Sequence, residues 1–301
     1  PVAGAAGEDA GTQPADELAA RETTSLLSEM PAGASFGTFV HRILENVDFA
    51  TGDLGRELLN AVDKEPAGYA EATTGDPVQL AHGLEVALSA PLGGQAAGMR
   101  LRDLTRADRL DELVFELPLA GGDSPTGEVL LADLGHLFAR HVRSGERLAN
   151  YASDLLAPQL AVNLRGYLTG SLDLVFRSHR ENGDDRFFVV DYKTNWLGAA
   201  GEGLTAWHYR AAALELEMRR SHYPLQAMFY LVALHRYLRW RLPGYDPGTN
   251  LGGAYYLFLR GMACPGAPLV KGEPCGVFAW QPRAELITGL SDLLAGEPVE
   301  P

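Results

Sequence analysis

The residues with the clearest potential for chemistry are two aspartates and a lysine in neighbouring apolar segments. Asp173 lies within GSLDLVF, residues 170–176, while Asp191 and Lys193 lie within FFVVDYK, residues 187–193. Successive side chains of a strand point to opposite faces, so residues two apart share a face. If the second segment is a strand, the Asp191 carboxylate and the Lys193 ammonium therefore point the same way.

The polar turn between these segments contains Asn182-Gly183, a pair typical of tight hairpins. A hairpin closed at this turn would place Asp173 beside Asp191. Two carboxylates at such short range repel each other and favour a cation between them. With a lysine on the same face, they indicate a divalent-metal site suited to hydrolysis.

An Asp-x-Lys pair on a strand is more often a solvated ion pair than a catalytic group. The chain, however, contains only three lysines, Lys64, Lys193 and Lys271, against 22 arginines. A lysine is a compact ammonium that can sit beside one water or one phosphoryl oxygen, whereas a guanidinium is a broad planar fork. The composition therefore favours a specific role for Lys193.

Further motifs surround the aspartates and the lysine in a fixed order. GASFGTFVHRILENVDF (residues 33–49) and DELVFELPL (residues 111–119) precede them, and YPLQAMFYLVALHRYLRWRL and GGAYYLFLRG follow. In content and order the set resembles the RecB-like nuclease family of the PD-(D/E)XK superfamily, from about residue 20 onward. The resemblance implies an α/β fold: a mixed central β-sheet flanked by helices, with a restriction-endonuclease-like core and a helical N-terminal part. It also implies metal-dependent hydrolysis of DNA phosphodiester bonds.

The same resemblance assigns roles to individual residues. The implied metal ligands are two carboxylates, one imidazole and one backbone carbonyl, those of Asp173, Asp191, His41 and Tyr192. Lys193 would orient the attacking water and offset charge on the phosphoryl oxygens. Mg²⁺ is the expected ion, and Mn²⁺ can replace it because Mn²⁺ accepts an imidazole ligand more readily.

His41 belongs to a segment with helical periodicity. Apolar residues at positions 36, 39, 40, 43, 44 and 47 predict a core-facing helix over residues 36–47. His41 falls at the border of the apolar stripe, where a histidine more often packs or forms hydrogen bonds than binds metal. The match to the family's Gly-Thr-x-x-His motif favours the metal ligand.

A second helix is predicted from about Leu225 to Arg239, with Gln226 and Tyr230 on one face. That face either meets solvent or lies against the catalytic strand, and the resemblance favours the strand. Gln226 would then hold Lys193 or a phosphate, and Tyr230 would support Gln226 or contact a DNA strand.

The other acidic and imidazole groups are weaker candidates. Glu112 is a possible metal neighbour through a water molecule, whereas Glu116 is expected to be exposed. The remaining histidines show no partner pattern and are expected at the surface: His82, His136, His141, His179, His208 and His222.

Composition and length set broad limits. The 301 residues are 46% hydrophobic and show no apolar run long enough to span a bilayer and no signal-peptide pattern, so a cytoplasmic protein with no membrane partner is expected. Residues 1–20, rich in Ala, Gly, Glu and Asp, predict a flexible linker, followed by a nuclease domain over residues 21–301. A start at Pro1 favours a piece of a longer chain.

Partners and cofactors follow partly from the chain and partly from the resemblance. The net charge of −14 predicts weak DNA binding by this chain alone. The resemblance implies a helicase–nuclease complex with RecC-like and RecD-like subunits, acting on single strands from unwound duplex ends, and loading of a RecA-like recombinase during DNA repair. No G-x-x-x-x-G-K-[ST] motif is present, so no ATP site is expected. Two cysteines, Cys264 and Cys275, cannot form the four-thiolate iron–sulfur cluster of some relatives.

Two other interpretations remain open. The chain could be a catalytically idle nuclease fold that docks partner subunits or RecA. The intact set of Asp173, Asp191, Lys193 and His41 argues against this, since like charges are costly to hold together without a function. A metal-dependent phosphatase acting on small molecules would instead predict a compact pocket.

Overall fold

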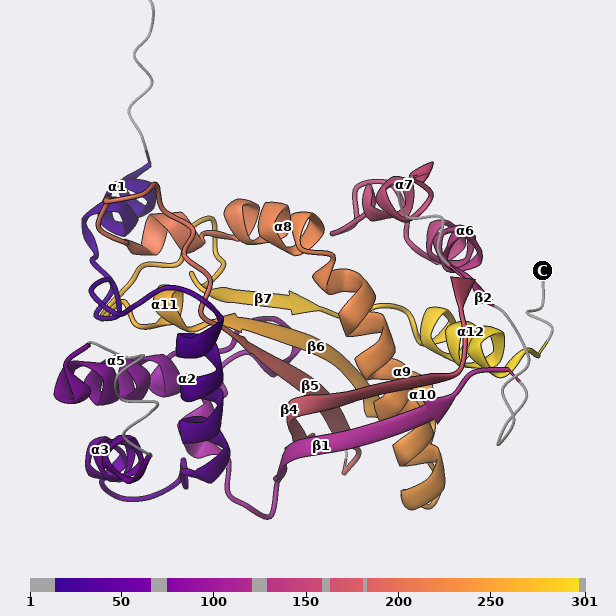
Figure 1. The fold of residues 1–301 in the computed structure, drawn as a ribbon, viewed down its shortest axis with the longest axis horizontal. Coiled ribbons are helices and arrows are strands. Elements are labelled where there is room, and N and C mark those ends of the chain that lie inside the picture. The colour runs from indigo at the N-terminus through magenta and orange to yellow at the C-terminus, as the bar shows by residue number, and fades with distance from the viewer. Residues whose placement is uncertain (1–13, 66–74, 121–128, 159–162, 181–182, 298–301) are drawn as a thin grey trace, which may run out of the picture.

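A five-stranded mixed sheet forms the centre of the molecule (Figure 1). The computed structural model describes residues 14–65, 75–120, 129–158, 163–180 and 183–297. The strand order is β1 (Arg109–Pro118), β4 (Tyr167–His179), β5 (Asp185–Lys193), β6 (Leu251–Phe258) and β7 (Val277–Trp280). β5 and β6 are parallel, and every other neighbouring pair in this sheet is antiparallel.

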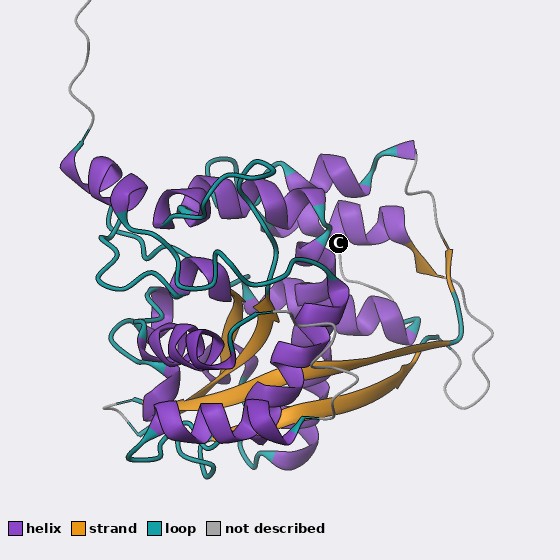
Figure 2. Ribbon diagram, turned by 60° about the vertical axis from the view of Figure 1, so that its left-hand side comes forward, coloured by secondary structure: helices purple, strands orange, loops and turns teal. Residues whose placement is uncertain are grey.

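Helices cover both faces of the sheet, as Figure 2 shows with strands in orange and helices in purple. One face packs against α2 (Ala34–Asn46), α3 (Leu54–Lys64) and α5 (Pro77–Ser89). The other packs against α6 (Leu131–His141), α8 (Ala211–Arg220), α9 (Tyr223–Arg241) and α12 (Ala284–Ala295). The mixed sheet, its flanking helices and the N-terminal helices confirm the predicted fold class.

Shorter elements complete the described part of the chain. They are the helices α1 (Ala15–Glu22), α7 (Tyr151–Leu155), α10 (Pro247–Asn250) and α11 (Leu259–Met262), the paired strands β2 (Val129–Leu130) and β3 (Asn163–Leu164), and the 3₁₀ turns η1 (Gly94–Ala96), η2 (Leu101–Asp103) and η4 (Ala206–Tyr209). No helix among the described residues is both long and apolar enough to cross a membrane.

The strand β5 shows why the sheet is buried on both sides. Phe188, Val190 and Tyr192 join the apolar cluster beneath α2, α3 and α5, whereas Val189 joins the cluster on the α9 side. An unbroken apolar run is what a strand covered on both faces requires. Burying each of these side chains contributes roughly 1.5–3 kcal/mol to the free energy of unfolding.

The predicted hairpin is present, and its strands are longer than expected. β4 and β5 pair antiparallel between Leu174↔Val190 and His179↔Asp185, and the turn residues 181–182 lie outside the described chain. β1 instead pairs with β4 along its whole length, from Arg109↔Phe176 to Pro118↔Tyr167. The first half of β4 therefore leaves β5 and continues with β1 as a two-stranded ribbon (Figure 1).

Helix α2 follows the periodicity seen in the sequence. Phe36, Phe39, Val40, Ile43 and Leu44 are all buried. Gly33 precedes the helix with φ of 111°, a conformation that favours glycine, and no side chain caps the helix start. The helix thus begins at residue 34 rather than 36 and ends at residue 46 rather than 47.

The linker expected over residues 1–20 is only partly available for comparison, because residues 1–13 lie outside the described chain. Within the described part, Ala15–Glu22 form helix α1, so residues 15–20 are helical and not a flexible linker. Alanine and glutamate favour helix as well as disorder, and the backbone N–H of Lys271 donates to Asp16 Oδ2 at 2.9 Å, tying α1 to the domain.

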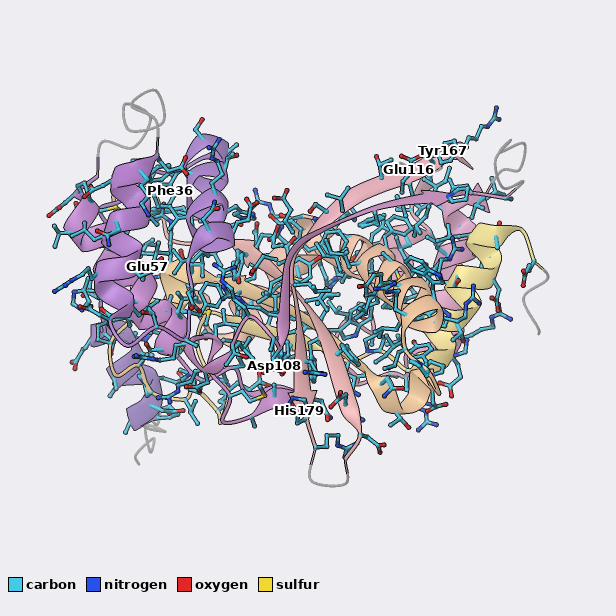
Figure 3. The ribbon with its side chains drawn as sticks, turned by 90° about the horizontal axis from the view of Figure 1, so that it is seen from below. Phe36, Glu57, Asp108, Glu116, Tyr167 and His179 are labelled. Carbon is cyan, nitrogen blue, oxygen red and sulfur yellow. The ribbon has the colours of Figure 1, made fainter. Side chains whose placement is uncertain are left out.

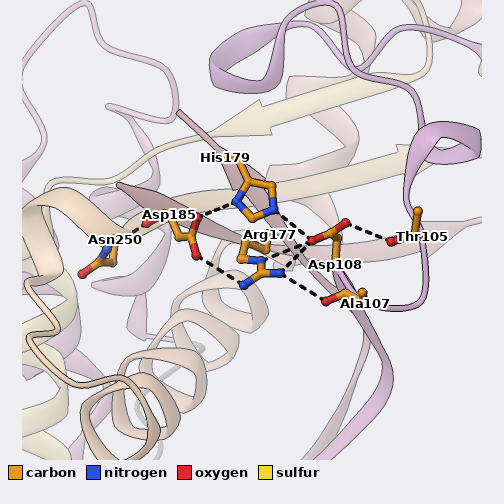
Figure 4. Close-up of polar contacts among 7 residues, drawn as sticks. All are labelled: Thr105, Ala107, Asp108, Arg177, His179, Asp185 and Asn250. Carbon is orange, nitrogen blue, oxygen red and sulfur yellow. Dashed lines mark hydrogen bonds and ion pairs between the residues drawn. The ribbon is translucent and has the colours of Figure 1, made fainter. Parts of the chain in front are cut away.

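A cluster of charged residues closes the end of the sheet away from the ribbon (Figures 3 and 4). The imidazole of His179 bridges two carboxylates, with Nδ1 2.7 Å from Asp185 Oδ1 and Nε2 3.1 Å from Asp108 Oδ1. Arg177 Nη2 donates to Asp108 Oδ1 at 2.9 Å, and Thr105 Oγ1 donates to Asp108 Oδ2 at 2.9 Å. His179 is exposed as predicted, but it has partners that the sequence pattern did not reveal. His208 departs further, because its side chain is only 15% exposed.

The cluster predicts a pH dependence of stability. Hydrogen bonds to Asp185 and then Asp108 raise the pKa of His179 above its ordinary value. A histidine with a raised folded-state pKa stabilises the protein below its unfolded-state pKa, and that contribution is lost as the pH rises through the folded-state value. We expect His179→Gln to lower the urea midpoint clearly at pH 5.5 and hardly at pH 9. The exposed His136, changed to Gln, is the control; equal losses at both pH values would contradict the bridge.

Candidate active site

The two aspartates lie where β4 and β5 separate. The ladder between the strands ends at Leu174↔Val190, and Asp173 and Asp191 are the next residues on either side. The backbone N–H of Tyr192 donates to Asp173 Oδ2 at 2.8 Å, so a side chain takes the place of a ladder carbonyl. β4 and β5 are inner strands of the sheet, so the site lies within the sheet where β5 ends.

Asp191 is the most buried charged group of the site. Its side chain is 4% exposed, against 18% for Asp173. Burial raises the pKa of Asp191 above its ordinary value; Lys193 opposes this effect, and the neighbouring Asp173 carboxylate adds to it. A buried carboxylate beside another carboxylate requires positive charge nearby to remain ionised.

Lys193 provides part of that charge. Its Nζ lies 2.6 Å from Asp191 Oδ2, as the shared strand face predicts. The ammonium also lies 4.1 Å from the centre of the Tyr223 ring and 5.3 Å from that of Tyr256. Two aromatic faces therefore stabilise the ammonium by cation–π attraction.

The helix α9 contributes a chain of hydrogen bonds behind the lysine. Lys193 Nζ donates to Gln226 Oε1 at 3.4 Å, and the Tyr256 hydroxyl donates to the same oxygen at 3.1 Å. Gln226 Nε2 in turn lies 2.7 Å from the Tyr230 hydroxyl. The structure thus brings Gln226 and Tyr230 to β5, beside Lys193, rather than to solvent. Tyr223 and Tyr256 were missed from the sequence, although Tyr223 lies one turn before Gln226 on the same helix.

His41 reaches the site from α2 on the other face of the sheet. Its Nδ1 lies 3.2 Å from Asp173 Oδ1 and its Nε2 2.9 Å from the Tyr192 carbonyl oxygen. Burial lowers the pKa of His41, but the hydrogen bond and charge of Asp173, the charge of Asp191 and the Tyr192 carbonyl together raise it, and the net shift is upward. Both ring nitrogens face acceptors, which is the arrangement of an imidazolium.

Gly37 lies where α2 comes close to the end of β5. A Cβ added at this position would lie 3.2 Å from Thr194 Oγ1, tighter than ordinary van der Waals contact. The glycine of the Gly-Thr-x-x-His motif therefore allows the helix to lie directly against the end of β5, and His41, one turn later, then reaches Asp173.

The site opens into a pocket of about 390 Å³. Its lining comes from α2, β1, β4, the end of β5 and the two residues after it: Ala34, Gly37, Thr38, His41, Arg42, Glu45, Glu112, Asp173, Tyr192, Lys193, Thr194 and Asn195. Glu112 stands opposite Asp173 on β1, with φ of 49°. Burial and a hydrogen bond to Glu112 raise the pKa of Glu45, so these two carboxyl groups lie together beside the aspartates. Glu116 is exposed, as expected.

The groups present suit a hard divalent cation. Across the described residues, no three His, Cys, Asp or Glu side chains are arranged to hold a metal as they stand, since His41 bonds directly to Asp173 and Tyr192. Asp191 Oδ2, however, is buried and lies 2.6 Å from Lys193 Nζ, so this carboxylate is held in the interior by a charged partner. Two carboxylates, a backbone carbonyl and an imidazole form a donor set that fits Mg²⁺ or Mn²⁺.

Comparison with known proteins places these residues in context. A sequence model described as the PD-(D/E)XK nuclease superfamily matches residues 15–274. The chain is 44% identical to the RecBCD enzyme subunit RecB of Mycolicibacterium smegmatis over 278 residues, covering 92% of the chain and 25% of that protein. Identity is 45% over 280 residues with RecB of Mycobacterium tuberculosis (91% and 25%) and 32% over 283 residues with RecB of Escherichia coli (93% and 20%). The chain therefore spans about a quarter or less of these relatives.

The donor set predicts that a divalent ion stabilises the folded chain. At a free Mn²⁺ concentration one hundred times its dissociation constant, linkage adds about 2.7 kcal/mol to the free energy of unfolding. We expect Mn²⁺ to raise the melting temperature of the wild-type chain by several degrees and that of Asp173→Asn far less, measured by differential scanning fluorimetry. Glu116→Gln, on the exposed ribbon, should respond as the wild type does. An undiminished response in Asp173→Asn would place the ion elsewhere.

Proposed function

The chain belongs to the PD-(D/E)XK nuclease superfamily, and we propose that it hydrolyses DNA phosphodiester bonds with a divalent metal ion, as the nuclease domain of a RecBCD-type enzyme. The observation that carries the proposal is the meeting of four side chains: Asp173, Lys193 and His41 line one open pocket, and the buried Asp191 is ion-paired with Lys193. These side chains come from β4, from β5 and from α2, which covers the sheet face opposite α9. Closeness in the sequence therefore does not explain why they meet.

The groups that would hold the ion are the carboxylates of Asp173 and Asp191, the Tyr192 carbonyl and one nitrogen of His41. When bound, the ion polarises the scissile phosphate and acidifies a coordinated water. His41 must release a ring proton to offer a nitrogen lone pair to the ion. Its present contacts with Asp173 and Tyr192 hold the imidazole within reach of two of the other three donors.

Lys193 is the proposed electrostatic catalyst. Its ammonium orients the attacking water and offsets the negative charge that grows on the phosphoryl oxygens. Gln226 and the two tyrosine rings fix the ammonium, so little reorganisation is needed when the charge develops. Tyr230 holds the Gln226 amide in the orientation that presents Oε1 to the lysine.

The proposed substrate is a single strand released from an unwound duplex end. The pocket is an open hollow between α2 and the β1–β4 ribbon, which suits a polymer passing over the site better than a small enclosed phosphate ester. The acidic chain, with a net charge of −14, offers little grip of its own. We therefore propose that RecC-like and RecD-like partners and a helicase deliver the strand, in a complex that processes DNA ends for recombinational repair and cooperates with a RecA-like recombinase.

Cleavage of end-labelled single-stranded DNA tests the proposal. With Mg²⁺ we expect cleavage that EDTA abolishes and that Lys193→Ala lowers by about 10²–10³-fold, the effect of removing one electrostatic stabiliser. Asp191→Ala should abolish it. Lys64→Ala, at the exposed end of α3, is the matched control and should cleave normally.

Outcomes of this experiment separate the alternatives. Full cleavage by Lys193→Ala would refute the assigned mechanism. An intact fold that binds Mn²⁺ but cuts no DNA, even when a RecBCD-type complex supplies the strand, would identify a docking module instead.

The aromatic faces around Lys193 generate a separate prediction. Tyr223→Phe keeps the ring below the ammonium, whereas Tyr223→Leu removes a cation–π contact worth about 0.5–2 kcal/mol. Single-turnover cleavage rates should therefore be close to wild type for Phe and about 2- to 30-fold lower for Leu. If Phe is as slow as Leu, the important feature is the hydroxyl, which accepts from Asn195 Nδ2 at 3.2 Å.

A further inference from the structure

A fully buried arginine lies behind the candidate site, at the end of the sheet where β5 finishes. Arg260 is 0% exposed and belongs to α11, directly after β6. Because β5 and β6 are parallel, with Lys193 beside Phe258, both strands end at the same side of the sheet. Arg260 is therefore two residues beyond the strand partner of the catalytic lysine.

The guanidinium of Arg260 binds the backbone of two separate segments. Its Nε donates to the Thr194 carbonyl at 2.9 Å, immediately after Lys193. Its two terminal nitrogens donate to carbonyls in the segment that leads into α2, those of Leu27, Met30 and Pro31. The rings of Phe36 and Trp196 lie 5.0 and 5.4 Å from the guanidinium carbon.

Burying the Arg260 guanidinium costs free energy, which indicates that this residue has a specific role. Burial lowers the pKa of Arg260, and among the described residues no carboxylate forms an ion pair with it. A buried cation without a counterion is tolerated only when hydrogen bonds satisfy it. The planar fork with five N–H donors can reach carbonyls on two sides at once, which the ammonium of lysine cannot do in the same geometry.

We propose that Arg260 is a positioning residue that sets His41 against the catalytic strand. α2 begins three residues after Pro31, has no side-chain cap of its own, and carries His41 two turns further on. Arg260 binds the segment that leads into α2, and the same guanidinium holds Thr194 at the end of β5. Without the Arg260 guanidinium, the segment before α2 and the residue after β5 can shift independently. The His41 ring then moves away from Asp173 and Tyr192. Since it rests on the proposed metal site, the inference deepens the proposed function.

Mn²⁺ binding measured by electron paramagnetic resonance gives a readout that does not depend on cleavage. We expect Arg260→Lys, once shown by circular dichroism to be folded, to bind Mn²⁺ about tenfold more weakly than the wild-type chain. The metal concentration for half-maximal cleavage should rise by a similar factor, with the KM for DNA unchanged. The matched control is Arg236→Lys, which removes a guanidinium bound to Ser291 on α12 and should leave Mn²⁺ binding unaltered.

A second variant keeps the proposal testable if Arg260→Lys does not fold. Trp196→Leu removes one ring beside the guanidinium and should weaken Mn²⁺ binding to a smaller extent. Mn²⁺ affinity unchanged in every folded variant, with only thermal stability reduced, would show that Arg260 is purely structural and overturn the proposal. A wild-type chain that binds Mn²⁺ but cuts no DNA would count against the proposed function, while the affinity comparison would still decide the role of Arg260.

Discussion

The hydrogen bond from the Tyr192 N–H to Asp173 is the contact on which the site depends. It exists because β4 leaves β5 just beyond Leu174↔Val190 and follows β1 instead. If β4 and β5 had remained paired, the Tyr192 N–H would face a backbone carbonyl of β4. The Asp173 carboxylate would then lack the hydrogen bond that holds it in the site. The separation of the strands thus creates both the space for the pocket and the orientation of one carboxylate. The Tyr192 carbonyl is freed by the same separation and faces His41.

The second constraint is the balance of charge at the point where β4 and β5 separate. Asp191 is almost fully buried beside another carboxylate, a combination that is unstable unless cations compensate it. His41 and Lys193 supply this compensation from opposite faces of the sheet. The aromatic rings of Tyr223 and Tyr256 stabilise the ammonium without forming hydrogen bonds to it, so its donors remain directed at Asp191 and Gln226.

The sequence was informative where chemistry follows local periodicity. The alternation of a strand placed Asp191 and Lys193 on one face, and the 3.6-residue repeat predicted the helix that carries His41. The sequence did not reveal the contacts that depend on topology. Nothing in the pattern around Tyr256 or Arg260 indicates that β6 lies parallel to β5, because that neighbour is set by a crossover of nearly sixty residues. The linker prediction failed over Ala15–Ala20 because composition alone does not distinguish an alanine-rich helix from a disordered segment.

The site lies between the two apolar clusters of the core, so ligand binding there is coupled to packing. His41 rises from the apolar cluster beneath α2, α3 and α5, whereas Gln226 and Tyr230 belong to the helix that covers the opposite face. The fork between β4 and β5 is where groups from both clusters meet. A ligand held by His41 and by Asp173 therefore binds only when α2 is correctly packed, and by linkage its binding free energy is added to that packing. Stability of the α2 side and affinity for such a ligand would thus be thermodynamically linked. A change that loosens α2 without touching a ligand weakens binding to the extent that it lowers the populated fraction of the packed helix.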